Sequence, residues 1–135
     1  MTPSEVVLAF FADFWRGDLE ASLSHCSHDA QFEFAPSLPY PSPAPMRQAL
    51  QAILNDMYTK FDPATGMQVS VDRIMTNNND VAIEYTASGN LQNGQRYVNR
   101  YLTLAIVHGD KLVLLRPYTD TAYVSESLLK RAVSQ

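Results

Sequence analysis

The sequence predicts an α+β fold in which helices pack on one face of a curved antiparallel sheet. Residues 96–107 and 111–119 alternate between apolar and polar side chains around a tight polar turn, which is typical of a β-hairpin with one face on a core. Strands of roughly ten residues exceed the usual length, and such long strands suit a bent sheet. Apolar residues follow helical spacing near the N-terminus, and the predicted order is helix, helix, strand, helix and then a meander of strands.

Composition and charge limit the classes of protein that fit this chain. It has 135 residues, 46% of them apolar, which suits one domain over residues 1–135. A net charge of −4 and scattered arginines argue against a nucleic-acid or anionic-membrane surface. No run approaches the ~20 apolar residues of a membrane span, and no secretory signal is recognisable. The single cysteine, Cys26, forms no internal disulfide, so we expect a cytoplasmic protein.

Two helices and a strand are expected in the first part of the chain. Residues 2–5, Thr-Pro-Ser-Glu, form a capping box. The helix over residues 3–15 is apolar on most of its surface, so we expect it to be buried. Gly17 ends this helix, and an aspartate caps the second helix, over residues 18–26. Alternation then predicts a strand over residues 30–35.

The segment 35–46 is rich in proline. We expect a stiff, extended loop that crosses the surface, and a disordered linker is the alternative. Residues 46–61 carry apolar side chains at helical spacing. Strands are predicted over residues 67–75 and 81–89, and a short terminal helix over residues 122–133.

Four features, in this order, resemble the SnoaL-like and ketosteroid-isomerase-like branch of the nuclear-transport-factor-2-like superfamily. They are the helix end at 15–20, the joint at 28–33, the Asn-Arg-Tyr strand at 99–101, and residues 109–121. The resemblance implies a cone-shaped half-barrel, a curved sheet wrapped around three N-terminal helices with a central apolar cavity, usually as a homodimer. The family includes isomerases, polyketide cyclases, epoxide hydrolases, dehydratases and non-catalytic binders, so the fold does not decide the function.

The positions that carry catalysis in relatives hold other residue types here. The resemblance places the first-helix tyrosine of ketosteroid isomerases at Phe10, their base at Phe34 and their late-strand acid near Thr103. The carboxylate of limonene-epoxide-hydrolase-like members, on the last strand, corresponds to Pro117. Their earlier Arg-x-Asp pair falls near Glu84, which keeps one carboxylate.

Three residues are therefore the candidate catalytic residues: Glu84, Asn99 and Tyr101. Burial of Glu84 in its strand would raise its pKa into a range useful for proton transfer. The alternative is an outward-facing Glu84 in solvent or paired with Arg100. Asn99 and Tyr101 would donate hydrogen bonds to a carbonyl or developing enolate, or else Asn99 would bond local backbone and Tyr101 would belong to the core.

Further residues are expected to line a ligand pocket. Tyr97 and Thr103 share the strand face of Asn99 and Tyr101, and Tyr40 could close over a ligand from the proline-rich loop. For Tyr40 the alternative is a surface aromatic, and for Tyr58 it is a core position. The full expected set is Phe10, Phe14, Phe34, Tyr40, Tyr58, Tyr97, Thr103, Leu115, Pro117 and Thr119.

No metal site or cofactor is expected. His25, Cys26, His28 and Asp29 lie close together in sequence but match no recognised ligand spacing. The chain has no glycine-rich phosphate loop and no dinucleotide fingerprint. Cys26 is most simply a small buried residue.

Three functions remain open. The first is a cofactor-independent isomerase, cyclase or dehydratase acting on a small apolar carbonyl or polyketide-like compound. The second is a non-catalytic binding protein for a small apolar ligand, since the usual catalytic acids and bases are absent. The third is a structural subunit whose sheet face, with Arg100, Leu102, Leu104 and Ile106, packs on a second copy.

Overall fold

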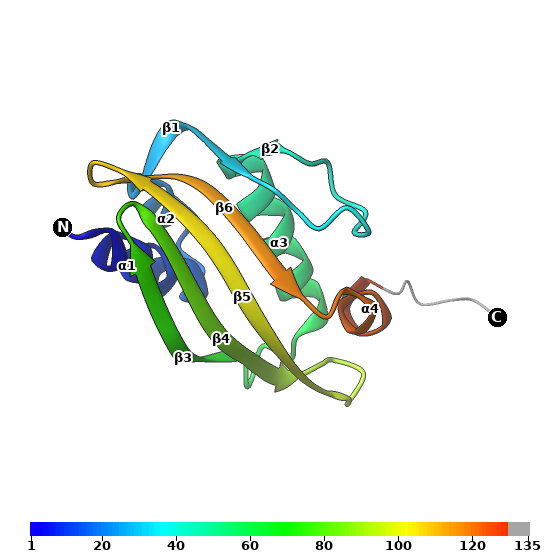
Figure 1. The fold of residues 1–135 in the computed structure, drawn as a ribbon. Helices are drawn as coiled ribbons and strands as arrows, with labels where there is room; N and C mark the ends of the chain where they lie inside the picture. The colour runs from blue at the N-terminus through cyan, green and yellow to red at the C-terminus, as the bar shows by residue number, and fades with distance from the viewer. Residues whose placement is uncertain (130–135) are drawn as a thin grey trace.

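A curved six-stranded sheet carries helices on one of its faces, as Figure 1 shows for this computed structural model, which describes residues 1–129. The strands are β1 (Cys26–Phe32), β2 (Ala44–Pro45), β3 (Met67–Asn77), β4 (Asp80–Asn90), β5 (Arg96–His108) and β6 (Lys111–Thr119). The helices are α1 (Pro3–Trp15), α2 (Leu19–Ser24), α3 (Met46–Lys60) and α4 (Thr121–Val124), which continues as a π-helical turn over Ser125–Leu129. The mixed α+β architecture predicted from the sequence is confirmed.

The N-terminal helices begin where the sequence predicts. The Thr2 hydroxyl accepts from the Glu5 backbone, and the Glu5 carboxylate accepts from the Thr2 backbone N–H at 2.8 Å. Asp18 caps α2 through a 2.9 Å bond from the backbone N–H of Ala21. The second helix ends at Ser24, two residues before its predicted end, because the chain enters β1 at Cys26. This strand also starts earlier than the predicted range of 30–35.

The four long strands form the predicted meander, and the turn between β5 and β6 lies where predicted. The sheet order is β2-β1-β6-β5-β4-β3. β1 differs from the expectation of an antiparallel sheet because it pairs in parallel with β6, with Phe32 opposite Leu115. Hairpin signals along the chain report only on sequential neighbours, so this contact between the first and last long strands had no local signal.

Side chains of β4 and β5 alternate between two faces. On β4, Val81, Ile83 and Tyr85 are buried against the helices, whereas Ala82 and Glu84 between them are partly exposed. We call the face that packs on the helices the inner face and the opposite one the outer face. The inner face, α1 and α3 together form the main core, whose members include Val6, Val7, Phe10, Phe11, Leu50, Ile83, Leu112 and Leu115.

The proline-rich segment is an ordered loop that returns to the sheet. Its Ser42 hydroxyl accepts from the Phe34 backbone N–H at 3.0 Å, and its last residues pair with β1 as β2. The ring of Tyr40 stacks on Phe34 with centroids 4.4 Å apart. The predicted terminal helix begins at Thr121, and residues 130–135 lie outside the described residues.

Candidate functional site

A pocket of about 150 Å³ lies between the inner face of the sheet and the helices, and it continues toward the proline-rich loop. Its walls are mainly aromatic and aliphatic. α1, α3, β1, the proline-rich loop, the strands of the meander and the C-terminal turn all contribute side chains to it. A partly open apolar pocket with few polar groups is the usual form of a small-molecule site.

Four hydroxyl groups of β4 and β5 lie in this apolar setting, and we call Tyr85, Tyr97, Tyr101 and Thr103 the hydroxyl cluster. Tyr85 and Tyr101 are directly opposite each other in the sheet, and their rings stack with centroids 5.2 Å apart. The cluster is placed by strand alternation, because its members occupy odd-numbered inner-face positions.

The cluster consists of two hydrogen-bonded pairs. The Tyr85 hydroxyl lies 3.2 Å from the Thr103 hydroxyl, and the Tyr97 and Tyr101 hydroxyls lie 2.6 Å apart. Each pair has two O–H hydrogens and uses one of them between its members. Among the described residues no other acceptor receives the second hydrogen, so each pair can donate one hydrogen bond to a ligand.

These phenols stay neutral and act as donors at neutral pH. Burial raises the pKa of Tyr85 to about 12, and the neighbouring Thr103 hydroxyl opposes this effect. Burial also raises the pKa of Tyr101 and of Tyr97 above the usual value. A neutral hydroxyl in a desolvated site suits the stabilisation of negative charge that develops on a ligand oxygen.

A carboxylate lies on the helical wall of the same pocket. Asp56 of α3 lines it, and the Tyr40 hydroxyl donates a hydrogen bond to the Asp56 carboxylate. Burial and the neighbouring Asp56 both raise the pKa of Tyr40. Within residues 1–129, Asp56 is the one charged side chain among the pocket-lining residues.

Most of the residues expected to bind a ligand do line this pocket. Tyr101 is also there, although it was expected as a catalytic residue. The pocket-lining members of the expected sets are Phe10, Phe14, Phe34, Tyr40, Tyr97, Tyr101, Thr103, Leu115, Pro117 and Thr119. The Phe10, Phe34 and Thr103 positions, which match catalytic positions in relatives, therefore contribute two rings and a hydroxyl to its wall.

Three of the expected residues, Glu84, Tyr58 and Asn99, lie outside the pocket lining. Glu84 is on the outer face, opposite Arg73 and Leu102 across the strands, because alternation turns it away from the inward Tyr85. Its position differs from the expected pocket role and matches the solvent-facing alternative. Tyr58 is 67% exposed on α3, outside the apolar stripe of that helix, so it neither lines the pocket nor belongs to the core.

Asn99 holds one member of the hydroxyl cluster, Tyr97, through a hydrogen bond. Its side-chain nitrogen donates to the Tyr97 hydroxyl at 3.1 Å and to the Asp120 carbonyl at 3.4 Å. Its side-chain oxygen accepts from the backbone N–H of Arg100 at 3.0 Å. The amide thus makes local contacts, which was the alternative expectation, and it orients Tyr97 while lying outside the pocket lining.

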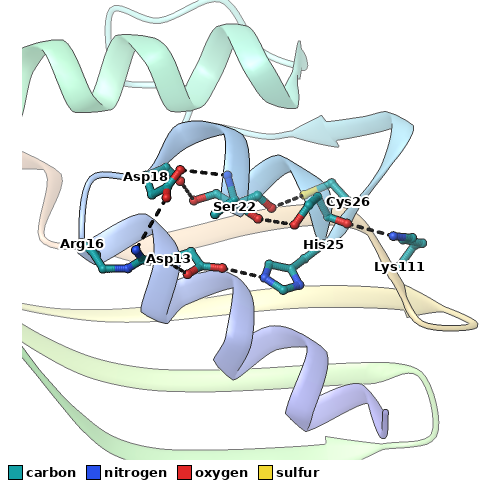
Figure 2. Close-up of polar contacts among 9 residues, drawn as sticks. Asp13, Arg16, Asp18, Ser22, His25, Cys26 and Lys111 are labelled. Atoms are coloured by element: carbon teal, nitrogen blue, oxygen red, sulfur yellow. Dashed lines mark hydrogen bonds and ion pairs between the residues drawn. The ribbon is translucent and has the colours of Figure 1, made fainter.

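The histidine and cysteine near residue 25 belong to a polar network between α1, α2 and the β5–β6 turn (Figure 2). His25 Nε2 and Asp13 Oδ2 are 2.7 Å apart, and the Arg16 guanidinium also contacts the Asp13 carboxylate. Burial raises the pKa of the Cys26 thiol to about 12, so the thiol stays protonated. The network links α2 to its neighbours, and among the described residues no group of three His, Cys, Asp or Glu is arranged to hold a metal ion.

Sequence reasoning missed Asp56 and Tyr85, although both left a signal. Asp56 follows Ile53 by three positions and Ala49 by seven, which places it beside the apolar stripe of its helix. Tyr85 continues the buried alternation of Val81 and Ile83. Glu84 and Tyr85 are adjacent on β4 and therefore point to opposite faces, so an expectation that places Glu84 in the pocket leaves Tyr85 out of it.

The curved, unclosed sheet with helices on its inner face is the fold of the nuclear-transport-factor-2-like proteins. The SnoaL-like domain model matches residues 7–115, and the chain belongs to this family. A comparison with curated proteins found no significant match. Among the described residues, no helix is long and apolar enough to cross a membrane.

Solved structures show the same fold at low sequence identity. A nuclear-transport-factor-2-like protein of unknown function from Burkholderia pseudomallei is 16% identical, with a TM-score of 0.78 over 96% of this chain and 99% of that chain. A proposed SnoaL-like polyketide cyclase from a Jannaschia species is 15% identical, with a TM-score of 0.76 over 93% and 90% of the two chains. The protein TerC, co-crystallised with polyporic acid, is 16% identical, with a TM-score of 0.78 over 95% and 98%.

Proposed function

We propose that the pocket binds a flat, largely apolar molecule of one or two rings through a carbonyl or phenolic oxygen held by the hydroxyl cluster. The observation that carries the proposal is the pair of O–H hydrogens, one from each hydroxyl pair, that have no acceptor among the described residues of a mainly apolar pocket. A buried donor without an acceptor favours a ligand that supplies one. The family of this chain and the polyporic acid complex of TerC support the same class of ligand.

The chemistry that fits this arrangement is proton transfer next to the ligand carbonyl, without a cofactor. Removal of a proton from the neighbouring carbon moves negative charge onto the carbonyl oxygen. Fixed hydroxyl donors around that oxygen stabilise the charge, and the apolar walls keep water away from it. Isomerisation, cyclisation and dehydration of a polyketide-like compound can all begin with this step.

A matched pair of probe ligands tests the binding part of the proposal. Because 2-naphthol presents a hydroxyl oxygen on two fused rings, it should bind at one site per chain and raise the melting temperature. Naphthalene lacks the oxygen and should bind about tenfold more weakly, the loss expected for one hydrogen bond of ~1.4 kcal/mol. Equal affinity for the two compounds in calorimetric titrations would remove the hydroxyl cluster from ligand recognition.

A second candidate is a binding protein without catalysis. Phe10, Phe34 and Thr103 at the positions that match catalytic residues in relatives favour this candidate. Both candidates predict binding of 2-naphthol, and they differ in turnover. A protein that binds carbonyl compounds in the pocket and never exchanges a proton with them would be a binding protein.

We also propose that the protein is a cytoplasmic homodimer. The outer face exposes apolar side chains that the fold leaves uncovered, among them Met75, Val98, Leu102 and Tyr118. The free thiol of Cys26 suits a reducing compartment. Sedimentation should show a dimer at micromolar concentration, and Leu102→Glu should shift it to the monomer because it places a charge in an apolar interface. A monomeric wild-type protein would contradict the proposed interface.

A further inference from the structure

We propose that Asp56 accepts the proton in the reaction of this pocket and that Tyr40 is its positioning residue. This inference rests on the proposed function, and it concerns a position that the family resemblance did not indicate. Among the described residues, Asp56 is the one charged side chain on the pocket wall. The ketosteroid-isomerase base position, by contrast, is occupied by Phe34.

Asp56 and the hydroxyl cluster lie on different walls of the pocket. Asp56 comes from α3, where Leu50, Ile53 and Met57 also line the pocket, and α3 lies across from the meander (Figure 1). The hydroxyl cluster comes from the inner face of β4 and β5. A flat ligand between these walls would present its oxygen to the sheet and an adjacent carbon to the helix. This division separates a base from the donors that hold the developing charge.

The surroundings leave the Asp56 carboxylate able to accept a proton. No lysine, arginine or histidine lines the pocket within residues 1–129, so no cation there occupies the carboxylate. One hydrogen bond comes from Tyr40, and a carboxylate has about four acceptor positions. The other titratable groups that line the pocket are the three phenols of the hydroxyl cluster, and on α3 itself Lys60 follows Asp56 by one turn.

Tyr40 is held firmly enough to position the carboxylate. Its ring stacks on that of Phe34 with centroids 4.4 Å apart and an interplanar angle of 22°. The ring centroids of Phe34 and Phe32 are in turn 4.5 Å apart. These contacts join the proline-rich loop to β1, and the Tyr40 hydroxyl joins it to α3 through Asp56. A donor fixed in this way holds the Asp56 carboxylate in one orientation on the pocket wall.

The proton-transfer step needs no oxidant, reductant or second reactant. A carboxylate oxygen of Asp56 removes a hydrogen from the carbon beside the carbonyl, and the C–H electron pair becomes the new C=C bond. The carbonyl π pair moves to the oxygen, where hydroxyls of the cluster donate to it. Asp56, now a carboxylic acid, returns the proton to the same carbon or to another carbon of the conjugated system.

Exchange of hydrogen for deuterium at C1 of 2-tetralone measures this step directly. The compound carries its most acidic hydrogens between an aromatic ring and a ketone, and 2-naphthol resembles its enol. In D2O followed by proton NMR, the wild-type protein should accelerate exchange above the buffer rate. Asp56→Asn should lower the protein-catalysed rate about a hundredfold or more, the usual contribution of a general base.

Two controls make the result interpretable. Asp110→Asn removes a carboxylate from the exposed β5–β6 turn and should leave the exchange rate unchanged. Asp56→Asn should still bind 2-naphthol and keep its circular dichroism spectrum, which shows that it folds. An Asp56→Asn protein that binds 2-naphthol and exchanges at the wild-type rate would overturn the inference while leaving the proposed function intact. Binding of 2-naphthol by a wild-type protein that accelerates no exchange would overturn it as well and favour the binding protein.

Tyr40→Phe separates positioning from simple support of the loop. The change removes the hydroxyl that holds the Asp56 carboxylate and keeps the ring that stacks on Phe34. The exchange rate at saturating 2-tetralone should therefore fall about tenfold, as expected for one lost hydrogen bond, while the affinity for 2-naphthol stays unchanged. An unchanged exchange rate, or a loss of 2-naphthol affinity that accounts for the slower exchange, would overturn the assignment of Tyr40 as a positioning residue.

Discussion

Neighbouring residues on β4, β5 and β6 meet two different environments, although they share the same strands. On the inner face, Tyr101 is partly buried in the core and its hydroxyl lies 2.6 Å from that of Tyr97. On the outer face, Tyr118 is 55% exposed. The same contrast separates buried Leu115 from the partly exposed Leu114 beside it. Residue type alone therefore says little about function in this sheet, and the period-two register decides it.

The largest effect expected from this contrast is on stability. Leu115→Ala should lower the free energy of unfolding by about 2–5 kcal/mol, because it leaves a cavity in the core. Leu114→Ala should cost less than about 1 kcal/mol in a monomer, since the side chain is already partly in water there. Urea unfolding of both variants in the monomeric Leu102→Glu background measures the difference. Equal losses in that background would contradict the assignment of Leu114 to an uncovered face.

The next effect concerns ligand affinity. Tyr101→Phe should weaken binding of 2-naphthol about tenfold, because a buried hydrogen bond is lost while the ring stays in place. Tyr118→Phe, on the outer face, should leave the affinity unchanged. Isothermal titration of the two variants compares them directly. An equal or larger loss with Tyr118→Phe would place the ligand on the outer face.

Glu84→Gln tests the difference between the two faces with a carboxylate on the outer face. This change would cut turnover about a hundredfold if Glu84 were the base. Its position on the outer face leads us to expect less than about a twofold change in 2-tetralone exchange, within the range of an uninvolved surface site. A hundredfold loss with normal 2-naphthol binding would restore Glu84 to the mechanism.

The smallest expected effect belongs to the ion pair between Glu33 and Arg116. The Arg116 guanidinium, 2.7 Å away, lowers the pKa of Glu33 below its usual value. A carboxyl with a lowered pKa stabilises the fold above its unfolded pKa, and this contribution is lost as the pH falls through the folded value. Glu33→Gln should therefore lower the melting temperature slightly at pH 7. The difference between the two melting temperatures should shrink as the pH falls below the unfolded glutamate pKa of about 4.3 and vanish once the pH has passed the lowered folded pKa.

Periodicity made most of the fold predictable from the sequence. The capping box at Thr2, the apolar stripes of α1 and α3, and the alternating strands each report on local structure, and their predicted ranges lie within a few residues of the observed ones. The parallel pairing of β1 with β6 was not predictable in this way. It depends on two strands that are far apart in the chain, and no turn between them signals their contact.

Within the sheet, the candidate site was predictable where alternation fixed the face. Tyr97, Tyr101 and Thr103 were expected on one face of β5 and do line the pocket together. Glu84 was misplaced because its face was not settled until the register with β5 was known. Asp56 was overlooked because one acidic residue beside an apolar helical stripe usually faces solvent. Tertiary packing, rather than local pattern, brings it to the pocket.

The parallel contact between β1 and β6 has a consequence for the order of folding. Ser27 and Leu112, which are in hydrogen-bond contact there, are 85 positions apart. During synthesis the N-terminal helices and β1 emerge early, but their edge of the sheet stays incomplete until the last strand has been made. The hairpins of β3 to β6 close only short loops. A truncation before residue 111 would therefore leave β1 without its main partner and expose the aromatic core that it covers.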